Sequence, residues 1–162
     1  MNKIVLLFTL AFLLFACKSG STATAQVAST KLDRTSQVAI KGNWQISKVS
    51  YPGSQYIKVT SFGIADSQCF VGSKWSFISN NNKGNMALTQ SDCPAFDSPI
   101  AWSINKDGNF VLKIVNPGTK SKTVTSGYIL KVANQTETTF QLIDKINVGG
   151  NMTDVVYDFQ KQ

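Results

Sequence analysis

Histidine is absent from this chain of 162 residues, and arginine occurs once, at Arg34. The missing imidazole removes the commonest general base and the commonest metal ligand of proteins. Serine and threonine are plentiful but have no histidine to activate them, and carboxylates such as Asp92, Asp97 and Asp144 are scattered along the chain. We therefore expect no catalytic residue, no metal site and no cofactor.

Clusters of basic residues are also missing. The formal net charge is +7, but the lysines occur singly between Lys31 and Lys161, with no run of five or six. A spread pattern of this kind is typical of a solvated surface, whereas nucleic-acid binding requires a concentrated patch. We expect no nucleic-acid partner, and attraction to an anionic membrane surface only as a minor role.

No apolar run is long enough to span a membrane. Residues 4–15 are apolar apart from Thr9 and follow Lys3. As a helix this run would reach about 18 Å, well short of the roughly 30 Å hydrocarbon core. A charged start, a short apolar centre and a small residue at its end are typical of a secretory signal peptide.

The signal ends in Leu14-Phe15-Ala16-Cys17. This sequence resembles the bacterial lipoprotein signal, which implies removal of residues 1–16 and acylation of Cys17 as the new first residue. The alternative is an ordinary signal peptide with a cysteine nearby. Several acyl chains would anchor the protein durably to a membrane. Because Lys18 follows the cysteine where many enterobacterial lipoproteins carry an inner-membrane retention aspartate, we expect an outer-membrane lipoprotein that faces the periplasm or the cell surface.

The two remaining cysteines, Cys69 and Cys93, form an even pair in an exported chain. Exported proteins meet an oxidising compartment, so we expect a disulfide between them. A catalytic or metal-binding thiol is the alternative. It is disfavoured because neither cysteine belongs to a C-x-x-C pair and the chain has no histidine.

The amino-acid composition of the chain changes near residue 40. Residues 17–39 are rich in serine, threonine, alanine and glutamine, which predicts a lipidated N-terminus followed by a flexible tether. Residues 40–162 contain short apolar runs separated by turn residues, and a short helix is expected around residues 63–68. The expected strands are 44–51, 56–62, 70–79, 85–90, 100–105, 109–115, 123–133, 138–147 and 152–160.

Apolar residues alternate with polar ones in several of these strands. Trp75 and Phe77 share one face with Val71, and Trp102 and Ile104 share another with Ile100. Period-two patterning predicts strands with one buried and one solvated face. A single closed antiparallel barrel satisfies this pattern and leaves no exposed sheet edge.

Gly42-Asn43-Trp44 opens the first expected strand. It resembles the G-x-W signature of lipocalins, whose tryptophan packs across the closed end of an eight-stranded up-and-down barrel. Residues 69–77, 85–88, 93 and 100–104 resemble the lipocalin-like lipoproteins of Bacteroidetes-type bacteria, in which one cysteine precedes an aromatic strand and another follows the next hairpin. The resemblance implies an all-β, lipocalin-like barrel of about eight strands, with Gly42 and Trp44 in a structural role at one end.

The resemblance does not extend to the ligands of animal lipocalins. Thr153-Asp154 lies in the last expected strand, where it does not match their second motif, and no arginine stands nearby. The resemblance therefore implies a scaffold more than an activity.

Two functions of different kinds fit this scaffold. In the first, a small hydrophobic or amphiphilic molecule binds inside the barrel; the alternative reading of the same residues is that they fill the core. In the second, the domain is a non-catalytic accessory subunit of an outer-membrane protein assembly. The residues expected to line the ligand cavity are Trp75, Phe77, Met86, Leu88, Trp102, Ile104, Tyr128, Phe140 and Tyr157.

Overall fold

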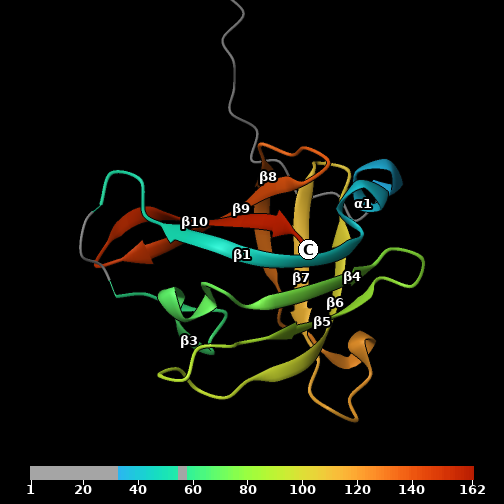
Figure 1. The fold of residues 1–162 in the computed structure, drawn as a ribbon, viewed down its shortest axis with the longest axis horizontal. Helices are drawn as coiled ribbons and strands as arrows, with labels where there is room; N and C mark the ends of the chain where they lie inside the picture. Colours follow the sequence, from blue (N-terminus) through green and yellow to red (C-terminus); the bar gives the residue numbers. More distant parts are fainter. Residues whose placement is uncertain (1–32, 55–57) are drawn as a thin grey trace, which may run out of the picture.

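The computed structural model describes residues 33–54 and 58–162, so the signal peptide, Cys17 and most of the expected tether lie outside the described residues. Eight antiparallel strands close into one barrel in the order β1-β10-β9-β8-β7-β6-β5-β4 (Figure 1). Strands adjacent in sequence are neighbours throughout, and β1 closes the barrel between β10 and β4. The strands are β1 (Gly42–Ser50), β4 (Lys74–Ile78), β5 (Lys83–Ala87), β6 (Asp97–Ile104), β7 (Asn109–Ile114), β8 (Tyr128–Ala133), β9 (Thr139–Val148) and β10 (Asn151–Lys161).

The predicted all-β, lipocalin-like barrel is confirmed. Its strands alternate as expected: in β6, Ile100, Trp102 and Ile104 are buried, whereas Ala101 and Ser103 are not. The turn residue Gly108 has a φ of 76° between β6 and β7, a conformation that costs glycine little.

One of the nine expected strands is not part of the barrel. Within the described part of residues 56–62, the only strand is β2 (Thr60–Ser61), which pairs with β3 (Ala65–Asp66) in a separate two-stranded sheet. The prediction is wrong here because Phe62 and Gly63 have φ values of 53° and 65°, which turn the chain back on itself. We call residues 60–66 the mouth hairpin.

The helix expected at 63–68 is also wrong. Those residues form the end of the mouth hairpin and the start of a 3-10 helix, η1 (Ser67–Phe70). Two expected strands begin too early for related reasons. β4 begins at Lys74 because Phe70 completes η1 and Gly72 has a φ of 82°. β8 begins at Tyr128, after the short 3-10 helix η2 (Ser121–Thr123) and an irregular segment.

The expected tether is too long at its C-terminal end. Helix α1 (Arg34–Ile40) lies within it, and the carboxylate of Asp33 caps this helix by accepting hydrogen bonds from the backbone N–H groups of Thr35 and Ser36. Ile40 is fully buried. The sequence shows no periodic helical pattern here because α1 has only seven residues, of which only Gln37 and Ile40 are buried.

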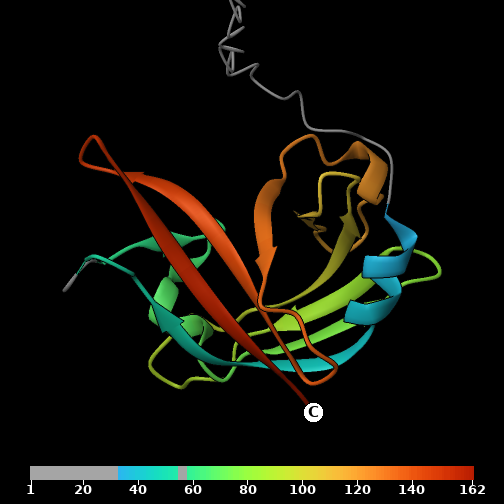
Figure 2. The same cartoon turned by 90° about the horizontal axis from the view of Figure 1, so that it is seen from above.

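The two ends of the barrel differ. Helix α1 lies at one end, where the backbone N–H of Asp33 donates to the carbonyl of Ile104, the last residue of β6. The mouth hairpin and η1 lie at the opposite end (Figures 1 and 2). We call the first the closed end and the second the mouth.

Candidate functional site

The residues predicted to line a cavity do converge on the barrel interior. Leu88 and Tyr128 are partly buried against the core. The other seven are buried: Trp75, Phe77, Met86, Trp102, Ile104, Phe140 and Tyr157.

Aromatic rings fill the closed half of the barrel. The ring centroid of Phe77 lies 5.0 Å from that of Trp102 and 5.5 Å from that of Phe110. Phe140 and Phe159 stack with their centroids 4.5 Å apart. Contacts of this length are those of a packed interior. Phe77, Trp102 and Phe140 therefore form core in this structure.

Trp44 occupies the closed end. Its side chain is 1% exposed, its indole N–H donates to the carbonyl of Ile40 at 2.8 Å, and its ring meets Phe140 edge-on with centroids 4.6 Å apart. The Nζ atom of Lys161 lies 5.7 Å from the ring centroid. Gly42 precedes it with a φ of 127°, a conformation that side chains rarely adopt. These contacts tie α1, β1 and β10 together.

The mouth is built differently, because its central side chain comes from outside the barrel. Phe62, at the turn of the mouth hairpin, is only 5% exposed. Its ring centroid lies 5.2 Å from those of Phe70 and Tyr128, 5.4 Å from that of Tyr157 and 6.2 Å from that of Trp75. Phe62 thus fills the space between barrel strands β4, β8 and β10 and η1.

The backbone at Phe62 is strained. The N–H of Ile64 donates to the carbonyl of Ser61 at 3.0 Å, and both residues between them have positive φ. Glycine adopts this left-handed conformation readily, but in a bulky residue such as Phe62 it costs about 1–2 kcal/mol. The strain persists because the ring is held on all sides. Strained residues of this kind often mark ligand-binding or switching segments.

Hydroxyl groups hold the mouth hairpin and η1 to the barrel. The hydroxyl of Tyr157 hydrogen-bonds that of Ser61, and the hydroxyl of Tyr51 hydrogen-bonds that of Ser67. The side-chain amide of Gln68 also donates to the Tyr51 hydroxyl at 2.9 Å. Burial is the main cause that raises the pKa of the Tyr157 phenol, so this group is a neutral hydrogen-bonding partner.

One carboxylate faces the interior near the mouth. Asp144 lies on β9 in the inward-facing series that begins with Phe140 and Leu142, and it pairs with the fully buried Val155 of β10. Burial raises the pKa of Asp144, and a backbone hydrogen bond with Lys145 opposes this only in part. The negative charge of Asp144 in turn contributes to the raised pKa values of Tyr128 and Tyr157.

The predicted disulfide is confirmed: Cys69 and Cys93 are joined, with their Cα atoms 5.7 Å apart. Cys69 belongs to η1, and Cys93 to the connection between β5 and β6. The bond therefore fixes η1, which carries Phe70, against the barrel. The mouth hairpin itself has no such covalent restraint.

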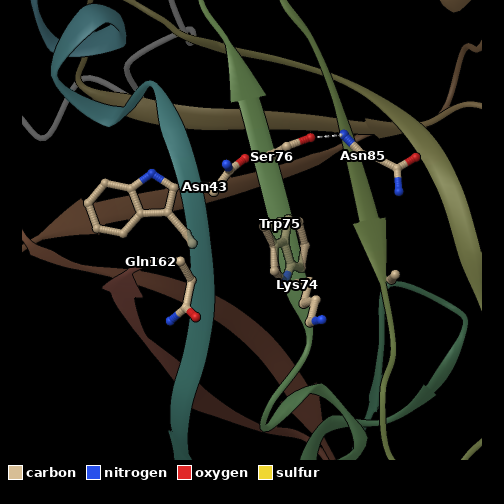
Figure 3. Close-up of a pocket in the computed structure, with 8 residues that line it drawn as sticks. Asn43, Lys74, Trp75, Ser76, Asn85 and Gln162 are labelled. Carbon is tan, nitrogen blue, oxygen red and sulfur yellow. Dashed lines mark hydrogen bonds between the residues drawn. The ribbon is translucent and has the colours of Figure 1, made fainter.

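The outer surface has shallow grooves of a different character. One groove of about 410 Å³ crosses β1, β4 and β5, and its lining includes Asn43, Lys74 and Asn85. In Figure 3 the Trp75 ring lies behind the β4 ribbon, on the barrel side, and a hydrogen bond joins the Ser76 hydroxyl to the backbone N–H of Asn85.

A second groove of about 450 Å³ lies beside the segment that follows β7, and Lys83, Lys120 and Lys122 line it. Across residues 33–54 and 58–162, no three acidic, cysteine or histidine side chains lie close enough together to hold a metal ion. In the same residues, no helix has both the length and the apolar character needed to cross a membrane.

Sequence reasoning missed Phe62 and Asp144 as site residues. Asp144 could have been found from the sequence. Apolar residues at positions 140, 142 and 146 indicate the inward-facing series of this strand, and Asp144 occupies the remaining position of that series. Phe62 carried no comparable signal, because nothing local distinguishes a phenylalanine at a strand end from one in a tight turn.

The comparison with protein families agrees with this architecture. The family model described as a lipocalin-like domain matches residues 40–142. Among solved structures, a complex of bovine odorant binding protein with a selenium-containing odorant is similar to this chain with a TM-score of 0.44 and 11% identity, over 85% of this chain and 78% of that one. None of the curated proteins matches this chain.

Proposed function

Because this chain belongs to the family of lipocalin-like domains, we propose that it is a membrane-anchored binding protein that holds a small hydrophobic or amphiphilic molecule in the mouth half of its barrel. An eight-stranded barrel encloses a space just wide enough for side chains or for one small ligand. In this structure the closed half is occupied by the barrel's own side chains, whereas the centre of the mouth is occupied by Phe62.

The position of Phe62 is the observation that carries the proposal. The ring occupies an apolar site between Phe70, Tyr128 and Tyr157, and it reaches that site from a hairpin that crosses the mouth. A ligand with an apolar group of similar size would make the same contacts once Phe62 withdraws. The barrel strands would not need to move.

The energetics of this exchange are favourable for a reversible binder. Exposing a buried phenylalanine costs about 1.5–3 kcal/mol. Release of Phe62 from its left-handed backbone conformation would return about 1–2 kcal/mol of that cost. The net cost is small enough for the apolar surface of an eight-carbon chain to offset, at about 0.8 kcal/mol per buried CH₂.

The membrane anchor is a further part of the proposal. It is supported by the sequence Leu14-Phe15-Ala16-Cys17, which lies outside the described residues. Acylation of Cys17 would keep the barrel beside a membrane, which is itself a source of hydrophobic and amphiphilic molecules. We place the domain at the outer membrane, on the periplasmic or the surface face.

Calorimetric titration of the mature protein in a neutral detergent with 1-octanol tests the proposal. We expect saturable binding of one molecule. Tyr128→Ala should weaken that binding at least fivefold because the ring contacts Phe62 in the mouth, and Ile129→Ala should leave it unchanged because Ile129 is 56% exposed on the outer face. If octanol shows no saturable binding, the ligand-binding proposal is wrong.

A second candidate function is that of an accessory subunit of an outer-membrane protein assembly. It is favoured by the closed half of the barrel, which is filled by packed side chains. In that case the barrel is a rigid spacer, and partner contacts lie on its outer face. This function predicts no octanol binding and no effect of Tyr128→Ala other than loss of stability.

A further inference from the structure

We propose that the ligand carries a cationic head, an alkylammonium group, and that Asp144 selects it. This inference rests on the proposed function and adds the chemical class of the ligand. It follows from where Asp144 faces, from its lack of a cationic partner among residues 33–54 and 58–162, and from the aromatic rings of the mouth.

Asp144 belongs to the inward-facing series of β9, on the mouth side of the packed rings. Strand β9 begins at the closed end, where Phe140 contacts Trp44, and runs toward the mouth. Asp144 is therefore four residues nearer the mouth than Phe140, which is two steps of the inward-facing series. Its neighbours in the same inward series are Leu142 and Ile146, and Val155 pairs with it across β10. The surrounding wall is therefore apolar.

No side chain in the described part of the chain neutralises this carboxylate. Between β9 and β10, Lys145 forms an ion pair with Asp154, with Nζ and Oδ1 2.9 Å apart. Both residues belong to the outward-facing series of their strands. Asp144 itself has a backbone hydrogen bond with Lys145 and no ion pair. A half-buried carboxylate without a counter-ion on an apolar wall is costly, and a cationic ligand would relieve that cost.

Aromatic faces around the mouth favour the same ligand class. Once Phe62 withdraws, the rings of Phe70, Tyr128 and Tyr157 line the vacated space. Tyr157 pairs with Leu142, two residues from Asp144 on β9, so the carboxylate and the Tyr157 ring belong to the same inner face of two adjacent strands. Aromatic rings attract an ammonium group through their negative faces, and an adjacent carboxylate adds a charge-assisted hydrogen bond.

Other head groups fit less well. A carboxylate or phosphate on the ligand would be repelled by Asp144. A neutral hydroxyl could donate one hydrogen bond but would leave the charge uncompensated. Coordination of a metal ion needs more ligands than the single carboxylate found here, since the described residues contain no group of three suitable side chains.

Three ligands of equal chain length test the inference: 1-octylamine, 1-octanol and octanoate, titrated by calorimetry into the mature protein at pH 7 in a neutral detergent. We expect octylamine to bind about 10- to 100-fold more tightly than octanol, the range of one hydrogen bond to a charged group. Octanoate should bind more weakly than octanol. The detergent takes up a given ligand equally whichever variant is present, so ratios between variants are unaffected by it, and ratios between ligands are calculated from the concentration of each ligand outside the micelles.

Asp144→Asn should reduce the preference for octylamine over octanol to less than threefold while leaving octanol affinity within a factor of about three. The matched control is Asp154→Asn, which removes the same charge from the outer face of the neighbouring strand and should keep the full preference. If wild-type protein binds octylamine and octanol equally, or if Asp144→Asn keeps the preference, the ammonium inference is wrong while the binding function stands. If octanol shows no saturable binding, the proposed function fails and this inference fails with it.

Discussion

Replacing Phe62 by alanine should strengthen ligand binding, although it removes a buried aromatic side chain. In the wild-type protein the ring is 5% exposed and must leave the mouth before an apolar group can enter. Exposing it costs about 1.5–3 kcal/mol, and that cost is subtracted from the binding free energy. A binding-competent state that is rarely populated lowers the apparent affinity by the same factor.

The expected gain follows from this cost. Release of the backbone strain at position 62 offsets about 1–2 kcal/mol of the displacement cost, which leaves a net cost of up to about 2 kcal/mol. Without the ring, the apparent affinity for octanol should therefore rise several-fold, by up to about 30-fold, because each 1.4 kcal/mol corresponds to a factor of ten. Calorimetric titration with octanol, below the thermal transition of the variant, measures the change.

Phe62→Leu is the matched control for this experiment. Leucine keeps most of the apolar volume in the mouth, so octanol affinity should stay within about threefold of wild type. Both variants are expected to lose stability, and the alanine variant by up to about 3–5 kcal/mol. An octanol affinity that falls in Phe62→Ala, or stays unchanged, would refute the reasoning, because Phe62 would then be part of the binding surface or of a permanent core.

Three further predictions concern the anchor, the disulfide and the interior carboxylate. Cys17→Ser should release the protein from membranes, and persistence in the membrane fraction after a high-salt wash would contradict lipid anchoring. Replacing Cys69 and Cys93 together by serine should lower the free energy of unfolding by about 3 kcal/mol in denaturant titrations, since the bond closes a loop with a sequence separation of 24; an unchanged midpoint would contradict this. Burial raises the pKa of Asp144 above its usual range, so the folded state holds its proton more tightly than the unfolded state. This stabilisation should be fully present below the ordinary aspartate pKa and be lost as the pH rises through the folded value, so Asp144→Asn should gain stability relative to wild type across that interval.

The barrel could be predicted from the sequence because its signals are local and repeated. In β6 and β10, period-two patterning identified the buried faces of Trp102 and Tyr157, which the structure confirms. The register that brings Cys69 and Cys93 together is not local, but an even cysteine pair in a chain expected to be exported was sufficient for the correct prediction. Trp44 lies at the closed end, as the G-x-W resemblance implied.

The mouth could not be predicted because its structure depends on tertiary contacts. Residues 56–62 have strand-like composition, yet Phe62 adopts a positive φ that only its packing against four rings maintains. The same limit applies to α1, whose helix is too short for a periodic signal and is stabilised by the burial of Ile40. Whether inward-facing side chains line a cavity or fill it depends on side-chain geometry, which strand patterning does not contain.

The central claim is that an apolar ligand replaces Phe62 inside the mouth. The most direct measurement is the set of intermolecular nuclear Overhauser effects between octanol and the ring protons of the mature protein in deuterated detergent. The account predicts contacts from the octanol chain to Tyr128, Tyr157 and Phe70, with contacts between the Phe62 ring and these residues weakened in proportion to occupancy. Contacts confined to outer-groove side chains such as Lys74 and Asn85, with those of Phe62 unchanged, would contradict it.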